Sequence, residues 1–106
     1  MTWDVVNCAS AGYHILYGKG EGLPAWTVDS GVCALGAKGS YDWLGVPDPA
    51  TYTSRFLWFL VVGDNGLDTE GLWGLTYPDG AEEGGAAASN ACGMAAKDLS
   101  GTCGTP

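Results

Sequence analysis

The chain has few basic residues. Lys and Arg together number four, against twelve Asp and Glu, and the formal net charge of the 106 residues is −8. Proteins that bind nucleic acid or anionic membrane surfaces need clustered positive charge to contact phosphate groups. We therefore expect neither nucleic acid nor an anionic membrane surface among the partners.

Long apolar runs are also missing. The longest, FLWFLVV from Phe56 to Val62, is much shorter than the ~20 residues that a membrane-spanning helix needs. The first residues, MTWDVVNC, contain neither the basic nor the apolar segment of a secretory signal peptide. We expect no membrane insertion, and we expect that a signal peptide was removed or that the chain is an excised domain.

The closely spaced cysteine pairs of zinc sites are absent, and the only histidine is His14. We therefore expect no zinc site. The cysteines, Cys8, Cys33, Cys92 and Cys103, are expected to form disulfides, which places the protein in the extracellular space or at a cell surface. Of the possible pairings we predict Cys8–Cys33 and Cys92–Cys103, each of which closes a modest loop and contributes about 3 kcal/mol.

Glycine and aromatic residues are abundant instead. Eighteen glycines, five tryptophans and five tyrosines indicate short strands joined by tight turns, and helical periodicity is almost absent. This pattern predicts an all-β sandwich or barrel. A turn-rich loop, 39–54, contains Pro47 and Pro49. We expect strands over residues 2–6, 13–17, 25–29, 32–35, 56–62 and 71–77.

The strand at 56–62 is apolar on both faces, whereas a strand with one face in water alternates between apolar and polar residues. Both of its faces must therefore be covered. From residue 78 the chain is rich in Gly and Ala and cannot build a core of its own. We expect an irregular tail, 78–106, that is pinned by Cys92 and Cys103.

The predicted strands carry a recognisable pattern, with Trp3 in the first, Tyr13-x-Ile15-x-Tyr17 in the second and Phe59-x-Val61-x-Gly63-x-Asn65 in the long one. Together with Glu70-Gly71 and Gly74, this pattern resembles the divergent fibronectin type III-like modules of secreted bacterial proteins. The resemblance covers Trp3 to about Tyr77. It implies an immunoglobulin-like sandwich of short antiparallel strands over residues 1–77, followed by the disulfide-stapled irregular C-terminal tail.

The chain departs from the family pattern at two points. Phe59 stands where the family usually has a tyrosine whose hydroxyl bonds to the backbone. The chain also begins without the family's first strand, which would leave unpaired backbone groups that cost about 1–3 kcal/mol each when buried. The tail could fill this gap, or another chain could supply a strand, or the register of the resemblance is different here.

The expected outer face of the sheet is a candidate interface. If Phe59 and Val61 face the core, Trp58 and Val62 face outward, and apolar patches of this kind mark contact sites. Either the tail or the loop with Tyr41 covers this face, or a partner chain does. The candidate interface residues are Thr2, Trp3, Val5, His14, Leu16, Trp58, Leu60 and Val62.

The sequence also bears on three further kinds of site, namely metal, carbohydrate and catalytic sites. Asp64, Asn65, Asp68 and Glu70 are candidate calcium ligands, because they bring oxygen atoms to one tight loop. Trp26, Trp43 and Trp73 are candidate carbohydrate-stacking residues. No catalytic residue is expected, because His14 lacks a nearby nucleophile pattern. Calcium is the one candidate cofactor.

These observations favour a non-catalytic extracellular structural module that associates with itself or with a neighbouring chain in a cell-surface or filamentous assembly. The alternative is a carbohydrate-binding or adhesion module of a larger secreted protein, with glycans as partners.

Overall fold

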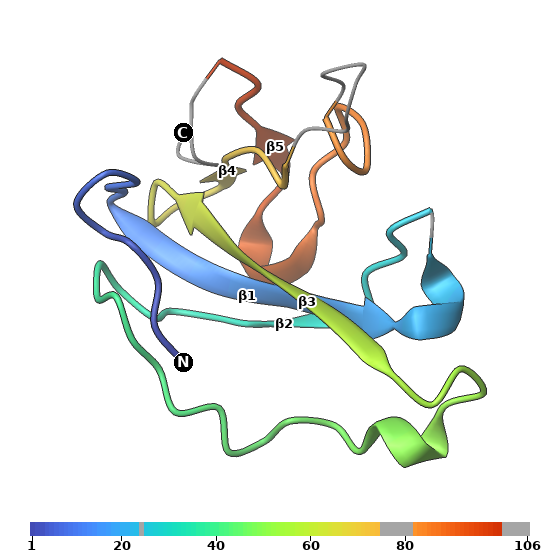
Figure 1. Cartoon of the computed structure of the whole chain (residues 1–106). Helices are drawn as coiled ribbons and strands as arrows, with labels where there is room; N and C mark the ends of the chain where they lie inside the picture. Colours follow the sequence, from blue (N-terminus) through green and yellow to red (C-terminus); the bar gives the residue numbers. More distant parts are fainter. Residues whose placement is uncertain (24, 75–81, 101–106) are drawn as a thin grey trace.

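The computed structural model describes residues 1–23, 25–74 and 82–100. Five strands form one sheet in the order β2-β1-β3-β4-β5 (Figure 1). All neighbouring strands are antiparallel except β4 and β5. In chain order, the strands are β1 (Gly12–Lys19), β2 (Ser30–Val32), β3 (Leu57–Asp64), β4 (Thr69–Glu70) and β5 (Ala96–Lys97).

The helical elements among the described residues are three single 3₁₀ turns. They are η1 (Gly20–Gly22), η2 (Pro49–Thr51) and η3 (Ala91–Gly93). Asp48 caps η2, since its side chain accepts a hydrogen bond from the Ala50 N–H. None of the helices in this part of the chain has the length and apolar character needed to span a bilayer.

β1 and β3 pair along their whole length, from Gly12 opposite Asp64 to Lys19 opposite Leu57. Because successive side chains of a strand point to opposite faces, this register gives the sheet two apolar faces. On one face are Tyr13, Ile15, Tyr17, Phe59 and Val61. On the other are His14, Leu16, Trp58, Leu60 and Val62.

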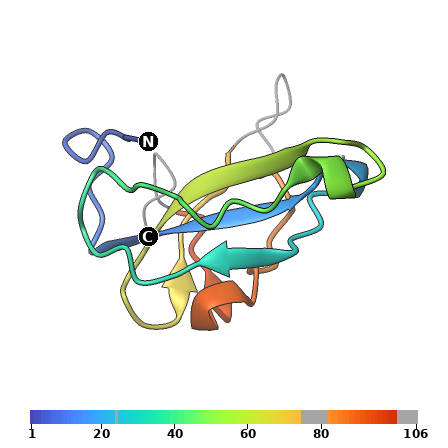
Figure 2. The same ribbon diagram turned by 90° about the horizontal axis from the view of Figure 1, so that it is seen from below.

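The face of Tyr13 and Ile15 is covered by two irregular segments. The N-terminal segment and the long connection 33–56 run along one side of the β1–β3 pair (Figures 1 and 2). Tyr13, Ile15 and Leu35 are the buried residues of this cluster, and Trp3, Val5, Val32, Tyr41, Trp43 and Val61 pack against them.

The face of Leu16 is also covered by the chain itself. Leu16, Trp58 and Val62 are only 0%, 7% and 1% exposed. Residues of the β1–β2 connection and of the segments around β4 and η3 pack over them, namely Leu23, Trp26, Val28, Trp73 and Ala91. β3 is therefore apolar on both faces because each face meets a layer of irregular chain.

The prediction that His14, Leu16, Trp58 and Val62 form an exposed interface is wrong. All four are buried within the chain, and Leu60 of the same face is half-buried. Of the two alternatives for this face, cover within the chain is the one that the structure shows. The tail takes part in this cover, because Ala91 packs against the cluster.

The predicted strands 13–17 and 56–62 are confirmed as β1 and β3. The predicted strand 2–6 is wrong, because only Thr2 forms a bridge, with Ser40. The Asp4 side chain accepts hydrogen bonds from the N–H groups of Val6 and Asn7, which turns the chain away from an extended course. Residues 39–41 pair with this N-terminal segment through the bridge and through backbone hydrogen bonds from Trp3 to Gly39 and from Tyr41 to Met1.

Three other predicted strands are displaced. Residues 25–29 are irregular, since Trp26 has a left-handed φ of 56°, and β2 occupies 30–32 in place of the predicted 32–35. Residues 71–74 form no strand, and 75–77 lie outside the described residues. The sheet continues instead through β4 to β5, which belongs to the segment predicted to be an irregular tail. The described residues form one sheet, whereas an immunoglobulin-like sandwich has two.

A disulfide joins Cys33 to Cys92, with their Cα atoms 5.4 Å apart. Both predicted pairings, Cys8–Cys33 and Cys92–Cys103, are therefore wrong. Short loop length favoured them, but tertiary packing decides: η3 lies against β2, where a side chain at Gly31 would contact Cys92 Sγ. Cys103 lies outside the described residues.

Candidate functional site

His14 lies between two carboxylates in the interior. Its Nδ1 is 2.6 Å from Asp64 Oδ2, and its Nε2 is 2.9 Å from Glu70 Oε2. The three side chains come from β1, β3 and β4, and they are 0%, 5% and 0% exposed. We call this group the carboxylate–histidine triad.

The geometry of the triad favours a protonated imidazole, because both ring nitrogens can donate hydrogen bonds only in that form. Burial is the largest single influence on the pKa of His14 and lowers it, but the hydrogen bonds and charges of Glu70 and Asp64 together raise the pKa above its ordinary value. For Glu70, burial is again the largest single influence and acts to raise the pKa. The hydrogen bonds from His14 and Ser89 outweigh burial, and the pKa of Glu70 is lowered. The triad therefore carries a net charge of about −1, from one imidazolium and two carboxylates.

The triad also attaches the C-terminal segment to the sheet. Glu70 accepts hydrogen bonds from the Ser89 N–H at 2.5 Å, from the Ser89 hydroxyl at 3.0 Å and from Trp73 Nε1 at 3.4 Å. Asp64 Oδ1 accepts one from the Gly66 N–H at 2.8 Å. No local sequence pattern indicates this group, because the residues meet only when the pairing register of three strands is known.

We expect the stability of the protein to be highest at mildly acidic pH. The raised pKa of His14 gives a stabilisation that is complete below its ordinary value of 6.5 and is lost as the pH rises through the folded pKa. The lowered pKa of Glu70 gives a second stabilisation. It is complete above the ordinary Glu pKa of 4.5 and is lost as the pH falls through the folded pKa. Urea unfolding across the pH range measures both limbs.

The loss of stability around neutral pH belongs to His14, since the chain has one histidine. Burial also raises the pKa values of Tyr13 and Tyr52 above 10.0, so these groups contribute a loss only at strongly alkaline pH. The acidic limb is shared, because hydrogen bonds also lower the pKa values of Asp4, Glu21 and Asp98. Glu70→Gln should therefore make the acidic limb shallower without removing it. Stability that stays constant from mildly acidic to alkaline pH would contradict the charged form of the triad.

The four candidate calcium ligands do not converge. Asn65 Oδ1 accepts hydrogen bonds from the N–H groups of Leu67, Asp68 and Thr69, so it closes the β3–β4 turn. Asp64 and Glu70 both face His14. Within the described residues, no group of three or more His, Cys, Asp and Glu side chains could hold a metal ion.

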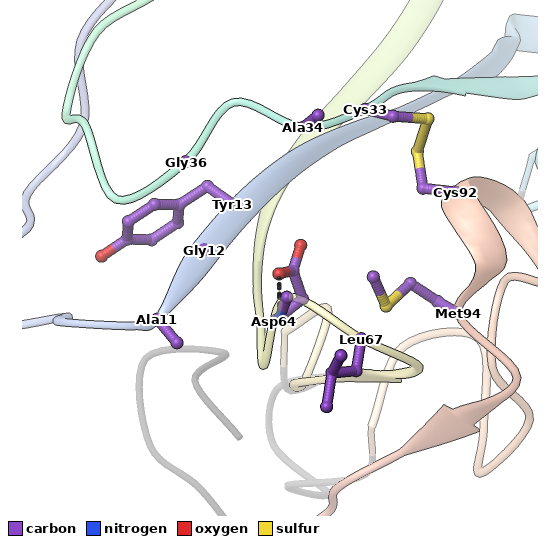
Figure 3. Close-up of a pocket in the computed structure, with 11 residues that line it drawn as sticks. Ala11, Gly12, Tyr13, Cys33, Ala34, Gly36, Asp64, Leu67, Cys92 and Met94 are labelled. Carbon is purple, nitrogen blue, oxygen red and sulfur yellow. Dashed lines mark hydrogen bonds between the residues drawn. A yellow bond between two sulfur atoms is a disulfide. The ribbon is translucent and has the colours of Figure 1, made fainter.

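A pocket of about 330 Å³ lies beside Asp64. Figure 3 shows the carboxylate between Gly12 and Tyr13 on one side and Leu67 and Met94 on the other, with the Cys33–Cys92 disulfide at one end. The pocket thus combines apolar and sulfur-containing walls with one buried carboxylate.

Two of the candidate carbohydrate residues are used in packing. Trp26 stacks edge-on against Trp58, with their ring centroids 5.1 Å apart, and donates a hydrogen bond to Glu83. The Lys97 ammonium lies 3.9 Å from the centroid of the Trp73 ring, whose other contacts include Gly84. Both tryptophans are half-buried, and these contacts use their rings in the packing of the chain itself.

Trp43 lies in a different environment, on the outer side of the Tyr13 face. Its ring centroid is 5.3 Å from that of Tyr17 and 6.0 Å from that of Phe59. Phe59 is 48% exposed, and Leu44, which follows Trp43 in the chain, is 94% exposed. We call Tyr17, Trp43, Leu44 and Phe59 the aromatic surface.

The remaining interface candidates lie at the N-terminus. Thr2 is exposed, and Trp3 and Val5 are half-buried against the Tyr13 cluster. Sequence reasoning placed Phe59 in the core and so missed the aromatic surface. Exposure of Phe59 depends on how far the connection 33–56 extends over the sheet, which no local pattern reveals.

Comparisons of the chain with protein-family models, with curated proteins and with solved structures found no match. The function of this chain must therefore be inferred from its own residues.

Proposed function

We propose that the protein is a non-catalytic structural module that associates with further copies of itself through the aromatic surface. The observation that carries this proposal is the series of ring contacts from Tyr17 through Trp43 to the half-exposed Phe59. The exposed Leu44 follows Trp43 directly in the chain. Exposed apolar groups that gather in one place mark contact sites, and rings held by their neighbours lose little conformational freedom on binding.

A second copy suits this surface, because none of its four residues carries a charge and a like surface can meet it without desolvating ions. The chemistry of the triad supports a non-catalytic role. His14 is 0% exposed, and both of its ring nitrogens already contact carboxylates. It therefore cannot act as an acid or base on a bound substrate without a rearrangement of the core.

Two further expectations belong to this proposal. The Cys33–Cys92 disulfide supports an oxidising, extracellular location. The resemblance to fibronectin type III-like modules stays a prediction, since one sheet covered by irregular layers is the arrangement of the described residues.

The substitution Leu44→Asp should weaken self-association about tenfold or more, because it places a charge on an apolar contact without a folding cost. Leu67→Asp is the matched control, since Leu67 is 78% exposed and lies in the β3–β4 turn. Sedimentation equilibrium gives the dissociation constants.

Association should also strengthen with added salt, because each copy carries a net charge of −8. A protein that stays monomeric at all concentrations, or equal effects of the two substitutions, would refute the proposal.

Carbohydrate binding is the second candidate, and the half-buried Trp43 beside the exposed Phe59 favours it. If the aromatic surface stacks on sugar rings, Trp43→Ala abolishes retention on a polysaccharide column whereas Leu67→Asp does not. Retention that survives Trp43→Ala would exclude this use of the surface.

A further inference from the structure

The carboxylate of Asp64 retains hydrogen-bonding capacity toward the pocket. Its Oδ2 contacts His14 and its Oδ1 accepts a hydrogen bond from the Gly66 N–H, whereas each carboxylate oxygen has two acceptor positions. A Cβ atom at position 12 would lie 2.6 Å from Oδ1. Because residue 12 is glycine, it places no side chain of its own over this oxygen, which lines the pocket with the rest of Asp64.

The charge of the triad is also incompletely balanced. One imidazolium faces two carboxylates, and among the described residues the ion pairs join no other cation to Asp64 or Glu70. Lys97 is engaged elsewhere, with Glu82 at 2.9 Å and over the Trp73 ring. A cation that enters the pocket would therefore approach a buried negative charge, in surroundings where screening by water is weak.

The walls of the pocket select the kind of cation. Met94 and Tyr13 are 5% and 4% exposed and offer thioether and ring carbon atoms, and Leu67 adds a methyl-bearing side chain. A calcium or magnesium ion needs several oxygen ligands, but this pocket offers one carboxylate. An aliphatic chain that ends in a positively charged group suits this pocket, because the chain can pack against the apolar walls and the charge can pair with the Asp64 carboxylate.

We propose that this pocket binds a primary ammonium group on an aliphatic stem, with the ammonium at Asp64 and the stem between Leu67 and Met94. A lysine side chain of a peptide and a free alkylamine share this chemistry. The site is separate from the aromatic surface and does not depend on self-association.

An NMR titration tests the site with three probes: n-butylammonium, Nα-acetyl-lysine N-methylamide and the uncharged 1-butanol. Saturable shifts of the Gly12, Gly66 and Leu67 amide signals and of the Met94 methyl signal are expected with both cations. Tighter binding of the lysine amide, by about tenfold, would identify peptide lysine as the ligand, and the reverse order would identify a free amine. Butanol binding as tight as that of butylammonium, or unchanged pocket signals, would overturn the proposal.

A pair of variants tests the location of the site without altering the triad. Leu67→Lys introduces a competing charge at the pocket and should weaken binding of butylammonium about tenfold or more. Leu44→Lys makes the same substitution at an exposed leucine of the aromatic surface and should leave binding unchanged. Equal binding by both variants and the unmodified protein would contradict the site. Loss of self-association in Leu44→Lys with intact amine binding would separate the two proposals.

Discussion

Replacement of His14 by alanine is expected to lower the free energy of unfolding by about 3–5 kcal/mol, the usual cost of leaving a buried charge without its partner. Asp64 and Glu70 would then face each other's charge in the interior, since both are at most 5% exposed. A single domain is stable by only about 5–15 kcal/mol. Urea unfolding at mildly acidic pH, where the triad is fully charged, measures the loss.

A triple variant separates lost charge pairing from lost packing. His14→Ala combined with Asp64→Asn and Glu70→Gln has the same deletion at position 14 but no buried carboxylate charge. We expect it to be more stable than His14→Ala alone, because the penalty arises from the uncompensated charges. Two results would show that the triad is not a buried ion cluster. One is a triple variant that is less stable than His14→Ala alone. The other is a loss of unfolding free energy in His14→Ala of under about 1 kcal/mol, which is typical of a surface ion pair.

Removal of the disulfide by Cys33→Ala with Cys92→Ala should cost about 4 kcal/mol on the chain-entropy model, because the bond spans a sequence separation of 59 residues. The bond also holds η3 against the edge strand β2, so its loss should first release the segment that carries Ser89. Hydrogen exchange at Ser89 and at β5 would report this release, and denaturant unfolding gives the free energy.

Peptide mapping under non-reducing conditions is the control for this prediction. Proteolysis should yield a Cys33–Cys92 peptide, and the paired variant should lack it while β1 and β3 keep their exchange protection. Recovery of a Cys8–Cys33 peptide from the native protein would contradict the structure. An unchanged free energy of unfolding in the variant would show that the bond does not restrict the unfolded chain.

The sequence was sufficient to predict the two central strands. Alternation in Tyr13-x-Ile15-x-Tyr17 and the unbroken run from Phe56 to Val62 are local signals, and both became long strands. The same run indicated that both faces of β3 are apolar, as the register shows, but it left open whether the chain itself or a partner covers the second face. The short strands β2, β4 and β5 were misplaced or missed, because two or three residues become a strand only through the neighbour that they pair with.

The sites were harder to predict because each depends on contacts between distant residues. His14 is separated from Asp64 by 50 residues and from Glu70 by 56, and only the register of β1, β3 and β4 brings them together. The oxygen-bearing side chains between Asp64 and Glu70 suggested calcium ligands. His14 contacts Asp64 and Glu70, and backbone N–H groups bond to Asp64 and Asn65. The disulfide followed the packing of η3 on β2, which loop length alone does not reveal.

An NMR dilution series tests most directly which face of the sheet is available for contact. We expect the signals of Trp43, Leu44 and Phe59 to shift as the protein is concentrated, whereas those of Leu16, Trp58 and Val62 stay constant. Signals at the aromatic surface that are independent of concentration would contradict the proposed contact. Shifts centred on Trp58 and Val62 would contradict the cover of the second face by the chain itself.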